Sequence, residues 1–228
     1  MSLDAVAAIV PQTFLAKLPP ALTSKVLESG RPLSVPAGRL LRHNPKSPGV
    51  AIVLDGVVRV FLRSPADRQV TVRYARPGET LGLVHLLGGE PEVHSQAVTA
   101  VALWLLPRRR LRAFAEQSCP LALAIAEECA ARVKDAVDEL ALASFGTVRQ
   151  QVARHLLDLA TGGADGLVAH VTQQELADAT GSVREVVARV LRELEALGLT
   201  RRAERSGRGI VIVDAAKLDA EVHFARTS

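Results

Sequence analysis

The sequence predicts an α+β protein built from three successive parts. Residues 31–107 contain short β-branched segments separated by Gly and Pro, residues 108–143 form one long helical stretch, and residues 171–213 contain two short helices and a basic hairpin. The chain has 228 residues, of which 48% are apolar and 23% charged, so it is long enough for two modest domains with their own cores. We expect a strand-rich domain at 1–110, a long helix and hinge at 111–145, and a helix-turn-helix domain at 146–228.

Within the expected domain at 1–110, the sequence predicts short helices followed by a β-sandwich or barrel. Residues 1–29 alternate apolar and polar side chains at helical spacing and are interrupted by Pro19 and Pro20. Strand-like runs follow at 39–41, 50–54, 57–62, 70–74 and 97–106. Turn signals separate them at 36–38, 44–45, 55–56, 64–67, 77–78 and 88–89. Many short strands at such spacing are typical of a β-sandwich or barrel.

The long helical stretch, Arg108 to Ala143 with a break near Pro120, carries an apolar seam. The seam residues alternate by four and three: Ala126, Ala130, Val133, Val137, Leu140 and Ser144. Two copies of such a helix can pair, and the alternative is a helix packed only on its own β domain. We favour the dimer because the seam is longer than one small β domain needs. A hinge follows at 144–148, and 148–159 predicts a helix with Val152, Leu156 and Leu159 inward. A surface turn is expected at 162–166.

A helix-turn-helix pattern occupies residues 171–197. Thr172 is placed to cap a first helix, with Glu175 completing a capping box. Gly181 suits the sharp turn because glycine tolerates a left-handed backbone, and Ser182 is then expected to cap a second helix. The apolar residues of that helix recur at three and four: Val186, Val187, Val190, Leu191, Leu194 and Leu197.

The second helix and the segment after it indicate DNA binding. Arg184, Glu185 and Arg189 fall near its N-terminal end and mostly off the apolar stripe, where a recognition helix presents side chains to base edges. An ordinary amphipathic helix with solvated charges is the alternative. Residues 200–213 favour DNA, because they predict a basic hairpin ending in a strand, as in a winged helix. Residues 184–208 contain seven Arg and four acidic residues, and this excess of positive charge suits contacts with DNA phosphates.

Composition narrows the class of protein further. Aromatic residues make up only 3%, which disfavours a stacking-based single-strand binder. The two cysteines, Cys119 and Cys129, are too few for a four-thiolate cluster and imply no disulfide framework. No signal segment or run of 18 apolar residues occurs, so we expect a cytoplasmic protein without a membrane partner. No metal-ligand cluster and no nucleophile–base pair at a recognisable spacing is present, which disfavours an enzyme.

Several motifs carry a family resemblance. They are Val35 to Gly38, Leu54 to Val60, Arg76 to Gly82, and Gly181 to Glu185 followed by Arg189. In this order they resemble the superfamily of the cyclic-AMP receptor protein and the fumarate–nitrate reduction regulator, over nearly the whole chain. The resemblance implies an N-terminal β-roll like the cyclic-nucleotide-binding jelly roll, a long dimerisation helix and a C-terminal winged helix-turn-helix. It further implies that Arg184, Glu185 and Arg189 read a half-site like TGTGA in a palindrome bound by a homodimer.

The same resemblance implies contacts to the DNA backbone and a set of partners. The backbone contacts are expected from Thr172, Gln173 and Ser182 near the helix starts, and from Arg205 and Arg208 on the wing. Double-stranded DNA and a second copy of the chain are the expected partners, with RNA polymerase as a further candidate. Another hypothesis is a small-ligand module that regulates a partner protein, with the winged helix used for protein contacts.

The sensor end departs from the cyclic-AMP pattern. Family members that bind the nucleotide carry Gly-Glu for the ribose and Arg-Ser for the cyclic phosphate. The matching pairs here are Gly82-Leu83 and His94-Ser95, and a neutral His does not replace a bidentate guanidinium. Ala136 and Val137 stand near the positions of the polar pair that would reach the purine. We therefore expect an effector other than cyclic AMP.

The region expected to hold that effector contains the following residues: Gly78, Glu79, Leu81, Gly82, His94, Ser95, Val133 and Val137. No cofactor follows from the sequence, and no metal site is expected. His85 and His94 suit haem ligation, as in gas-sensing relatives, while an isolated His pair is more often packed or solvated. A cyclic-nucleotide response, a small apolar effector and the absence of an effector stay open as alternatives.

Overall fold

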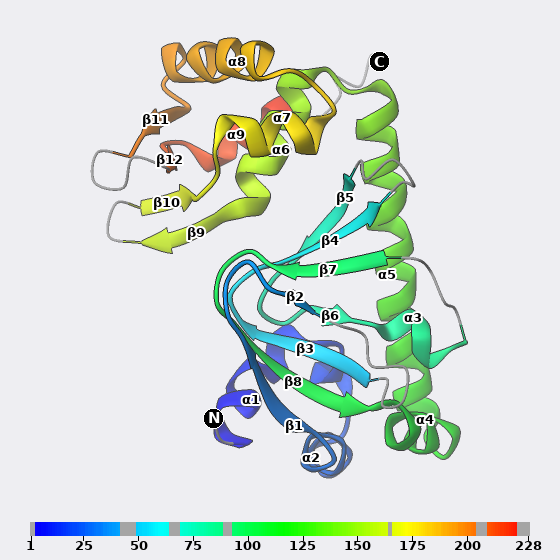
Figure 1. Cartoon of the computed structure of the whole chain (residues 1–228). Helices are drawn as coiled ribbons and strands as arrows, with labels where there is room; N and C mark the ends of the chain where they lie inside the picture. The colour runs from blue at the N-terminus through cyan, green and yellow to red at the C-terminus, as the bar shows by residue number, and fades with distance from the viewer. Residues whose placement is uncertain are drawn as a thin grey trace. The chain divides into compact units, whose positions relative to one another are not determined.

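The computed structural model describes residues 3–41, 49–63, 69–88, 93–163, 166–203 and 209–222 (Figure 1). The chain forms two compact units, of which the first covers residues 1–63 and 71–136 and the second covers residues 64–70 and 137–228. The division falls inside one continuous helix, α5 (Cys119–Phe145), so each unit contains part of it. The α+β class expected from the sequence is confirmed.

Two four-stranded sheets form the β part of the first unit. One has the order β1-β8-β3-β6, from strands Arg31–Val35, Val101–Pro107, Gly49–Asp55 and Thr80–Leu81. The other has the order β2-β7-β4-β5, from strands Leu40–Leu41, Val93–Ala97, Val58–Arg63 and Gln69–Ala75. Neighbouring strands run antiparallel, for example β3 against β8 with Ile52 opposite Trp104. The expected sandwich of short strands is therefore present.

The expected strand at 97–106 was wrong in its extent. Strand β7 ends at Ala97, a bend occupies residues 98 and 99, and β8 starts at Val101. A contact with a distant part of the chain fixes the bend, because the Thr99 hydroxyl accepts a hydrogen bond from the Val57 backbone N–H (2.9 Å). Strands β1, β6 and β7 were not predicted, because their sequences lack a β-branched run.

Strand β3 explains where the two cores of this unit lie. Its sequence is a continuous apolar run, and successive side chains of a strand point to opposite faces. Val50 and Ile52 pack into one core with the helices, whereas Ala51 and Val53 pack into the core between the sheets. Both faces of β3 are thus buried, which is why the run shows no polar alternation.

Short helices cover the outer face of the first sheet, as expected from residues 1–29. They are α1 (Leu3–Ile9), two 3-10 turns (Val10–Gln12 and Phe14–Lys17) and α2 (Pro20–Glu28), and α3 (Leu83–Leu86) joins them. Pro20 begins α2, a position where its missing N–H costs nothing. The buried Trp104 indole N–H donates to the Leu27 carbonyl (3.0 Å), which fixes α2 on the sheet.

Gly78 sits in the turn between β5 and β6 and closes the N-terminal segment onto the sheet. Its φ of +90° lies in the left-handed region. A Cβ at this position would stand 2.6 Å from the Gln12 carbonyl oxygen. The Gly78 N–H donates to the Val53 carbonyl, and the Val53 N–H donates to the Glu79 carbonyl, each at 2.9 Å. The backbone on both sides of the turn is therefore fixed.

The long helical stretch contains two helices, α4 (Arg108–Glu116) and α5. The break expected near Pro120 lies at Gln117 and Ser118, and Pro120 is in the first turn of α5. The start of α5 is held by apolar packing, since Leu121, Ala124 and Ile125 belong to the core beneath the first sheet. All six residues of the predicted seam are exposed in the single chain.

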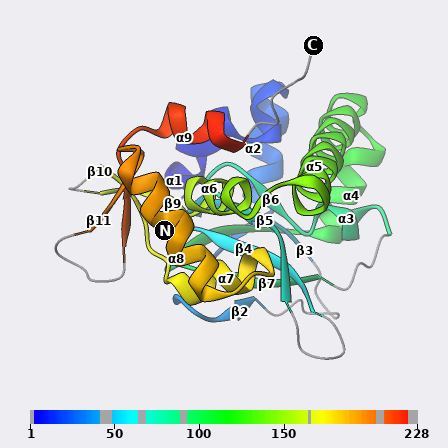
Figure 2. The same ribbon diagram turned by 90° about the horizontal axis from the view of Figure 1, so that it is seen from above.

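The second unit is a helical domain with a four-stranded sheet of order β11-β12-β10-β9. Its helices are α6 (Val148–Leu159), α7 (Gln173–Thr180), α8 (Arg184–Ala196) and α9 (Ala215–Val222), and α9 packs beside α6 (Figure 2). Thr147 caps α6 with a complete capping box to Gln150. Val152, Leu156 and Leu159 of α6 are buried, as predicted.

The strands of this unit are short. Strands β11 (Thr200–Arg202) and β12 (Ile210–Ile212) pair antiparallel and form the predicted hairpin. Strands β9 (Ala160–Gly163) and β10 (Gly166–Ala169) flank the surface turn expected at 162–166, of which residues 164–165 lie outside the described ranges. These two strands and α9 were not predicted.

Candidate functional site

The turn between α7 and α8 has the geometry expected from its sequence. The Thr172 hydroxyl accepts from the Glu175 N–H (3.1 Å), and the Glu175 carboxylate accepts from the Thr172 N–H (2.7 Å), which completes the capping box. Gly181 has a φ of +62° and ends α7. The predicted helix-turn-helix is confirmed.

One detail of that turn was wrong. The residue that precedes α8 is Val183, and it makes no side-chain capping bond. Ser182 lies one residue earlier, and its N–H donates to the Ala177 carbonyl (3.0 Å) as part of the end of α7. The predicted capping of α8 by Ser182 therefore does not occur, because Gly181 and Ser182 together complete the α7 terminus.

Helix α8 separates a buried apolar face from an exposed polar one. Val187, Val190 and Leu194 are buried in the domain core. Arg184, Glu185 and Arg189, by contrast, are exposed. Leu197, predicted to continue the apolar face, is 56% exposed, because the helix ends at Ala196 and Leu197 is its C-terminal cap. The three residues expected to contact bases are thus displayed together on the N-terminal half of α8.

A hollow of about 650 Å³ lies between the start of α7, the flank of α8 and the base of the hairpin. Four arginines line it together with the α7 N-cap, two glutamines of α7 and one carboxylate: Arg184, Arg192, Arg201, Arg202, Thr172, Gln173, Gln174 and Glu195. The excess of positive charge and the backbone N–H groups at the start of α7 suit a phosphate-bearing partner. Arg205 and Arg208, expected on the tip of the hairpin, lie outside the described residues.

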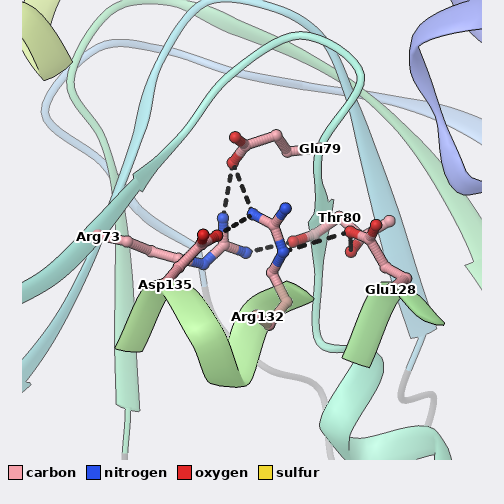
Figure 3. Close-up of polar contacts among 6 residues, drawn as sticks. All are labelled: Arg73, Glu79, Thr80, Glu128, Arg132 and Asp135. Carbon is pink, nitrogen blue, oxygen red and sulfur yellow. Dashed lines mark hydrogen bonds and ion pairs between the residues drawn. The ribbon is translucent and has the colours of Figure 1, made fainter. Parts of the chain in front are cut away.

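The expected effector region contains a network of charged residues at the junction of the sheets and α5 (Figure 3). Arg73 Nη1 of β5 lies 2.7 Å from Glu79 Oε2, and Arg132 Nη1 of α5 lies 3.4 Å from the same oxygen. Arg132 also pairs with Asp135 (3.1 Å) and Glu128 (3.5 Å). Burial lowers the pKa of the Arg73 guanidinium, and the neighbouring Glu79 carboxylate opposes that shift.

Of the residues expected in this region, only Glu79 belongs to the network. Leu81 and Gly82 follow it in the chain, and Leu81 is buried between the two sheets. His94 of β7 stacks on Phe61, with ring centroids 5.4 Å apart, and Ser95 pairs with Val60 in the same sheet. Val133 and Val137 are exposed, so they do not face the charged network.

Four residues of this network were not predicted from the sequence patterns: Arg73, Glu128, Arg132 and Asp135. A signal was present on α5, where Glu128, Arg132 and Asp135 repeat at four and three, two positions out of phase with the apolar seam. Residues two apart on a helix point roughly 200° apart, so this charged stripe lies on the opposite side from the seam. Arg73 gave no such signal, because its partners are distant in sequence.

Other chemistry finds little support in the described part of the chain. No group of three or more His, Cys, Asp or Glu that could hold a metal ion occurs there. Cys119 and Cys129 are free thiols. No helix in the described ranges is long and apolar enough to span a membrane.

Comparison with known proteins agrees with this architecture. Residues 150–221 match the Crp-like helix-turn-helix domain, and residues 32–118 match the cyclic nucleotide-binding domain. The transcriptional regulator LdrP of Thermus thermophilus is 31% identical over 177 residues, which cover 75% of this chain and 86% of LdrP. The chain belongs to the CRP/FNR family of transcription regulators.

Other members of the CRP/FNR family extend this similarity. The cyclic AMP receptor protein of Thermus thermophilus is 34% identical over 174 residues, covering 76% of this chain and 78% of that protein. A solved CRP/FNR-family regulator of the same organism has 26% identity and a TM-score of 0.67, covering 84% of this chain and 98% of its own. The chain is therefore a CRP/FNR regulator with a DNA-binding helix-turn-helix and a cyclic-nucleotide-binding domain, in a family of regulators rather than enzymes.

Proposed function

We propose that this CRP/FNR regulator acts as a homodimer on a palindromic, TGTGA-like DNA site. Arg184, Glu185 and Arg189 contact base edges, and an effector other than cyclic AMP controls the protein from the junction of the β-roll and α5. The observation that carries the proposal is the exposed set of these three side chains on the N-terminal half of α8, whose opposite face is buried. RNA polymerase is a further partner that a regulator of this kind would contact.

The three side chains suit different bases. Arginine donates two hydrogen bonds to guanine O6 and N7, and glutamate accepts from the cytosine amino group. Glu185 also repels phosphates at every site, so its presence among arginines favours base contact over general attraction to DNA.

The hollow beside α8 supports a set of backbone contacts around these base contacts. Thr172 and Gln173 line it at the start of α7, and Ser182 lies in the turn before α8. We expect these residues to fix the register of the domain on the duplex, together with Arg205 and Arg208 of the wing. Such contacts carry affinity and salt dependence but little sequence information.

The seam of α5 supports a dimer. Val133, Val137 and Leu140 are 63%, 58% and 66% exposed in the single chain. A straight row of large exposed apolar side chains on a helix is rare on a monomer surface and is typical of a helix that pairs with another. A palindrome and a two-fold dimer also match each other in symmetry.

The sensor side chains support an effector other than cyclic AMP. Leu83, which follows Gly82 where nucleotide-binding members carry Glu, is 4% exposed and packs in the core, so it offers a ribose no acceptor. His94 stacks on Phe61, and the two guanidiniums at the junction are paired with carboxylates. The protein then has two conformations that differ in the placement of the recognition helices. An effector at the junction acts by binding one of these conformations more tightly than the other.

Substitution of the base-contacting residues tests the proposal. Arg184→Ala is expected to weaken binding to a TGTGA-type palindrome by about 1 to 3 kcal/mol and to flatten preference at one base pair per half-site. Glu185→Ala is expected to relax preference at a cytosine while leaving or raising affinity for random DNA. Selection from a randomised half-site library measures both effects.

Two control variants complete the experiment. Arg208→Ala is expected to weaken binding to all sequences alike and to lower the salt slope by about one unit per contact. Arg112→Ala removes a positive charge from an exposed pair with Glu116 on α4 and is expected to change neither quantity. An equal, sequence-independent loss in Arg184→Ala and Arg208→Ala would show that α8 is only a charged face.

A further inference from the structure

Two guanidiniums from different elements meet at one carboxylate oxygen. Arg73 comes from β5, Arg132 from α5, and Glu79 Oε2 lies 2.7 Å and 3.4 Å from their Nη1 atoms. Figure 3 shows the two guanidiniums next to each other and both directed at the Glu79 carboxylate, with Arg73 reaching in from a strand and Arg132 from the helix. Glu79 therefore occupies the position that a bound anion would take between two arginines.

Each guanidinium is also held by groups other than Glu79. Arg73 Nη2 of β5 donates to the Thr80 carbonyl of β6, which lies in the other sheet. Arg132 pairs with Asp135 (3.1 Å) and Glu128 (3.5 Å) on its own helix, and Glu128 accepts from the Thr80 hydroxyl (2.9 Å). The contact with Glu128 is made by the buried Arg132 Nε, which has this ion pair but no hydrogen bond within the described residues. The two arginines would therefore stay directed at the same point if the Glu79 carboxylate left.

The Glu79 side chain is able to leave without a change of fold. Its backbone is fixed through Val53, as described for the Gly78 turn. Its side chain is 32% exposed, against 19% for Arg73 and 26% for Arg132, so it borders solvent on one side. Rotation about its side-chain bonds would carry the carboxylate into water and uncover the guanidinium pair on that side.

We propose that Arg73 and Arg132 form a binding site for the oxyanion of a small molecule, a carboxylate or a phosphate, and that Glu79 is its internal occupant. This proposal rests on the proposed function, which places the effector at the roll–α5 junction. With Glu79 inside, three carboxylates face two guanidiniums. With Glu79 in water, Glu128 and Asp135 balance the two arginines, and a singly charged ligand restores the original charge.

The exchange gives the ligand a means of acting on α5. The core beneath the first sheet includes Leu121, Ala124, Ile125 and the partly buried Cys129 of α5, whereas Glu128 and Arg132 connect the helix to Thr80 and Glu79 through polar contacts. An external oxyanion in place of the Glu79 carboxylate would pair with Arg132 from a different position. The turns of α5 that carry Arg132 would then prefer a different position as well.

Calorimetry with the full-length protein tests this site directly. The probe is inorganic phosphate at pH 7, with sodium chloride used to keep ionic strength constant. Glu79→Gln keeps the side-chain shape and removes the charge. Glu116→Gln is the matched control, because it makes the same charge change in an exposed pair on α4. We expect Glu79→Gln to bind one phosphate per chain about tenfold or more tightly than Glu116→Gln and the wild type. The reason is that a site filled by the Glu79 carboxylate for about nine-tenths of the time is open for about one-tenth, which weakens the apparent affinity for phosphate about tenfold.

Arg132→Met in the Glu79→Gln background locates the binding. If the double variant no longer shows the tighter phosphate binding of Glu79→Gln, the site is supported. If the double variant still binds phosphate as tightly, the phosphate binds elsewhere and the proposal is overturned. Equal affinities in Glu79→Gln and Glu116→Gln overturn it as well. Repeating the titration with acetate distinguishes the ligand classes: binding of acetate as well indicates a carboxylate-accepting site, and binding of phosphate alone restricts the site to phosphates.

A second measurement applies if Glu79→Gln does not fold. Phosphate is then expected to raise the melting temperature of the wild type more than that of Arg132→Met at equal ionic strength, and equal shifts overturn the proposal. The comparison is needed because phosphate stabilises proteins in general by exclusion from their surface. None of these readouts involves DNA. If the protein fails to recognise the DNA site, the proposed function alone is refuted. If phosphate binds at Arg73 and Arg132 but does not change DNA affinity, only the proposal that an effector controls DNA binding from this junction is refuted.

Discussion

Leu140→Glu is the sharpest test of the dimer. Leu140 is 66% exposed on α5, in line with Val133 and Val137, which are 63% and 58% exposed. Full burial of a Val or Leu side chain contributes about 1.5 to 3 kcal/mol, so the part still exposed is worth roughly 1 to 2 kcal/mol per side chain. A two-fold interface contains six such side chains, two from each of the three positions. Their burial contributes roughly 6 to 12 kcal/mol to the free energy of dimerisation, before the cost of association is subtracted.

The substitution removes two of these six contributions. The loss of roughly 2 to 4 kcal/mol raises the dimer dissociation constant by about 30-fold to 1,000-fold. Two carboxylates then face each other in an apolar interface without a cation, which adds to the loss. We therefore expect Leu140→Glu to be monomeric at micromolar concentration in sedimentation velocity.

A matched variant separates the seam from a general effect of added charge. Leu197→Glu changes the same residue type at a similar exposure of 56%, at the end of α8, and is expected to sediment like the wild type. An unchanged dimer in Leu140→Glu would refute the reasoning, because no interface through this seam tolerates that change.

Three further predictions concern the sensor, a helix cap and pH. Cyclic AMP is expected to give no saturable heat in calorimetry, and tight binding would contradict the assignment of Leu83 and His94. Thr172→Ala is expected to lower the free energy of unfolding by about 1 kcal/mol in urea denaturation, because it removes the α7 capping box, and no change would show that the cap is not formed in solution. Burial, with the Asp158 carboxylate adding to it and Arg154 opposing it, raises the pKa of Glu139 to about 7. The native state then holds that proton more tightly than the unfolded chain, so this group lowers stability as pH rises from about 4.5 through about 7. The melting temperature of Glu139→Gln minus that of the wild type should accordingly increase between pH 5 and pH 8, and a constant difference would contradict it.

The local parts of this structure followed from sequence, because the signals that define them lie within a few residues. Thr172 with Glu175 defined the start of α7, and Gly181 defined its end. Apolar spacing on α6 placed Val152, Leu156 and Leu159 correctly in the core. The seam of α5 was visible for the same reason, since its residues repeat along one helix.

The missed features depend on partners that are far apart in the chain. Strand β7 has the polar sequence Val93 to Ala97 and becomes a strand because β2 and β4 pair with it on either side. The junction of Arg73 with Arg132 joins residues 59 positions apart, and nothing in the local sequence of either indicates the other. Ser182 was assigned to the wrong helix because a serine after glycine suits either an N-cap or a helix end, and only the backbone geometry decides between them.

The contact between Gly78 and Gln12 limits how this sensor domain can be exchanged between proteins. The recognisable cyclic nucleotide-binding domain begins at residue 32, yet the turn that carries Glu79 is closed on one side by residue 12. A recombination event at the boundary of that domain would transfer the turn without this wall and give it a new neighbour. Inheritance of the junction therefore requires the N-terminal helices to travel with the β-roll, and any side chain larger than hydrogen at position 78 would have to evolve together with a displaced N-terminal segment.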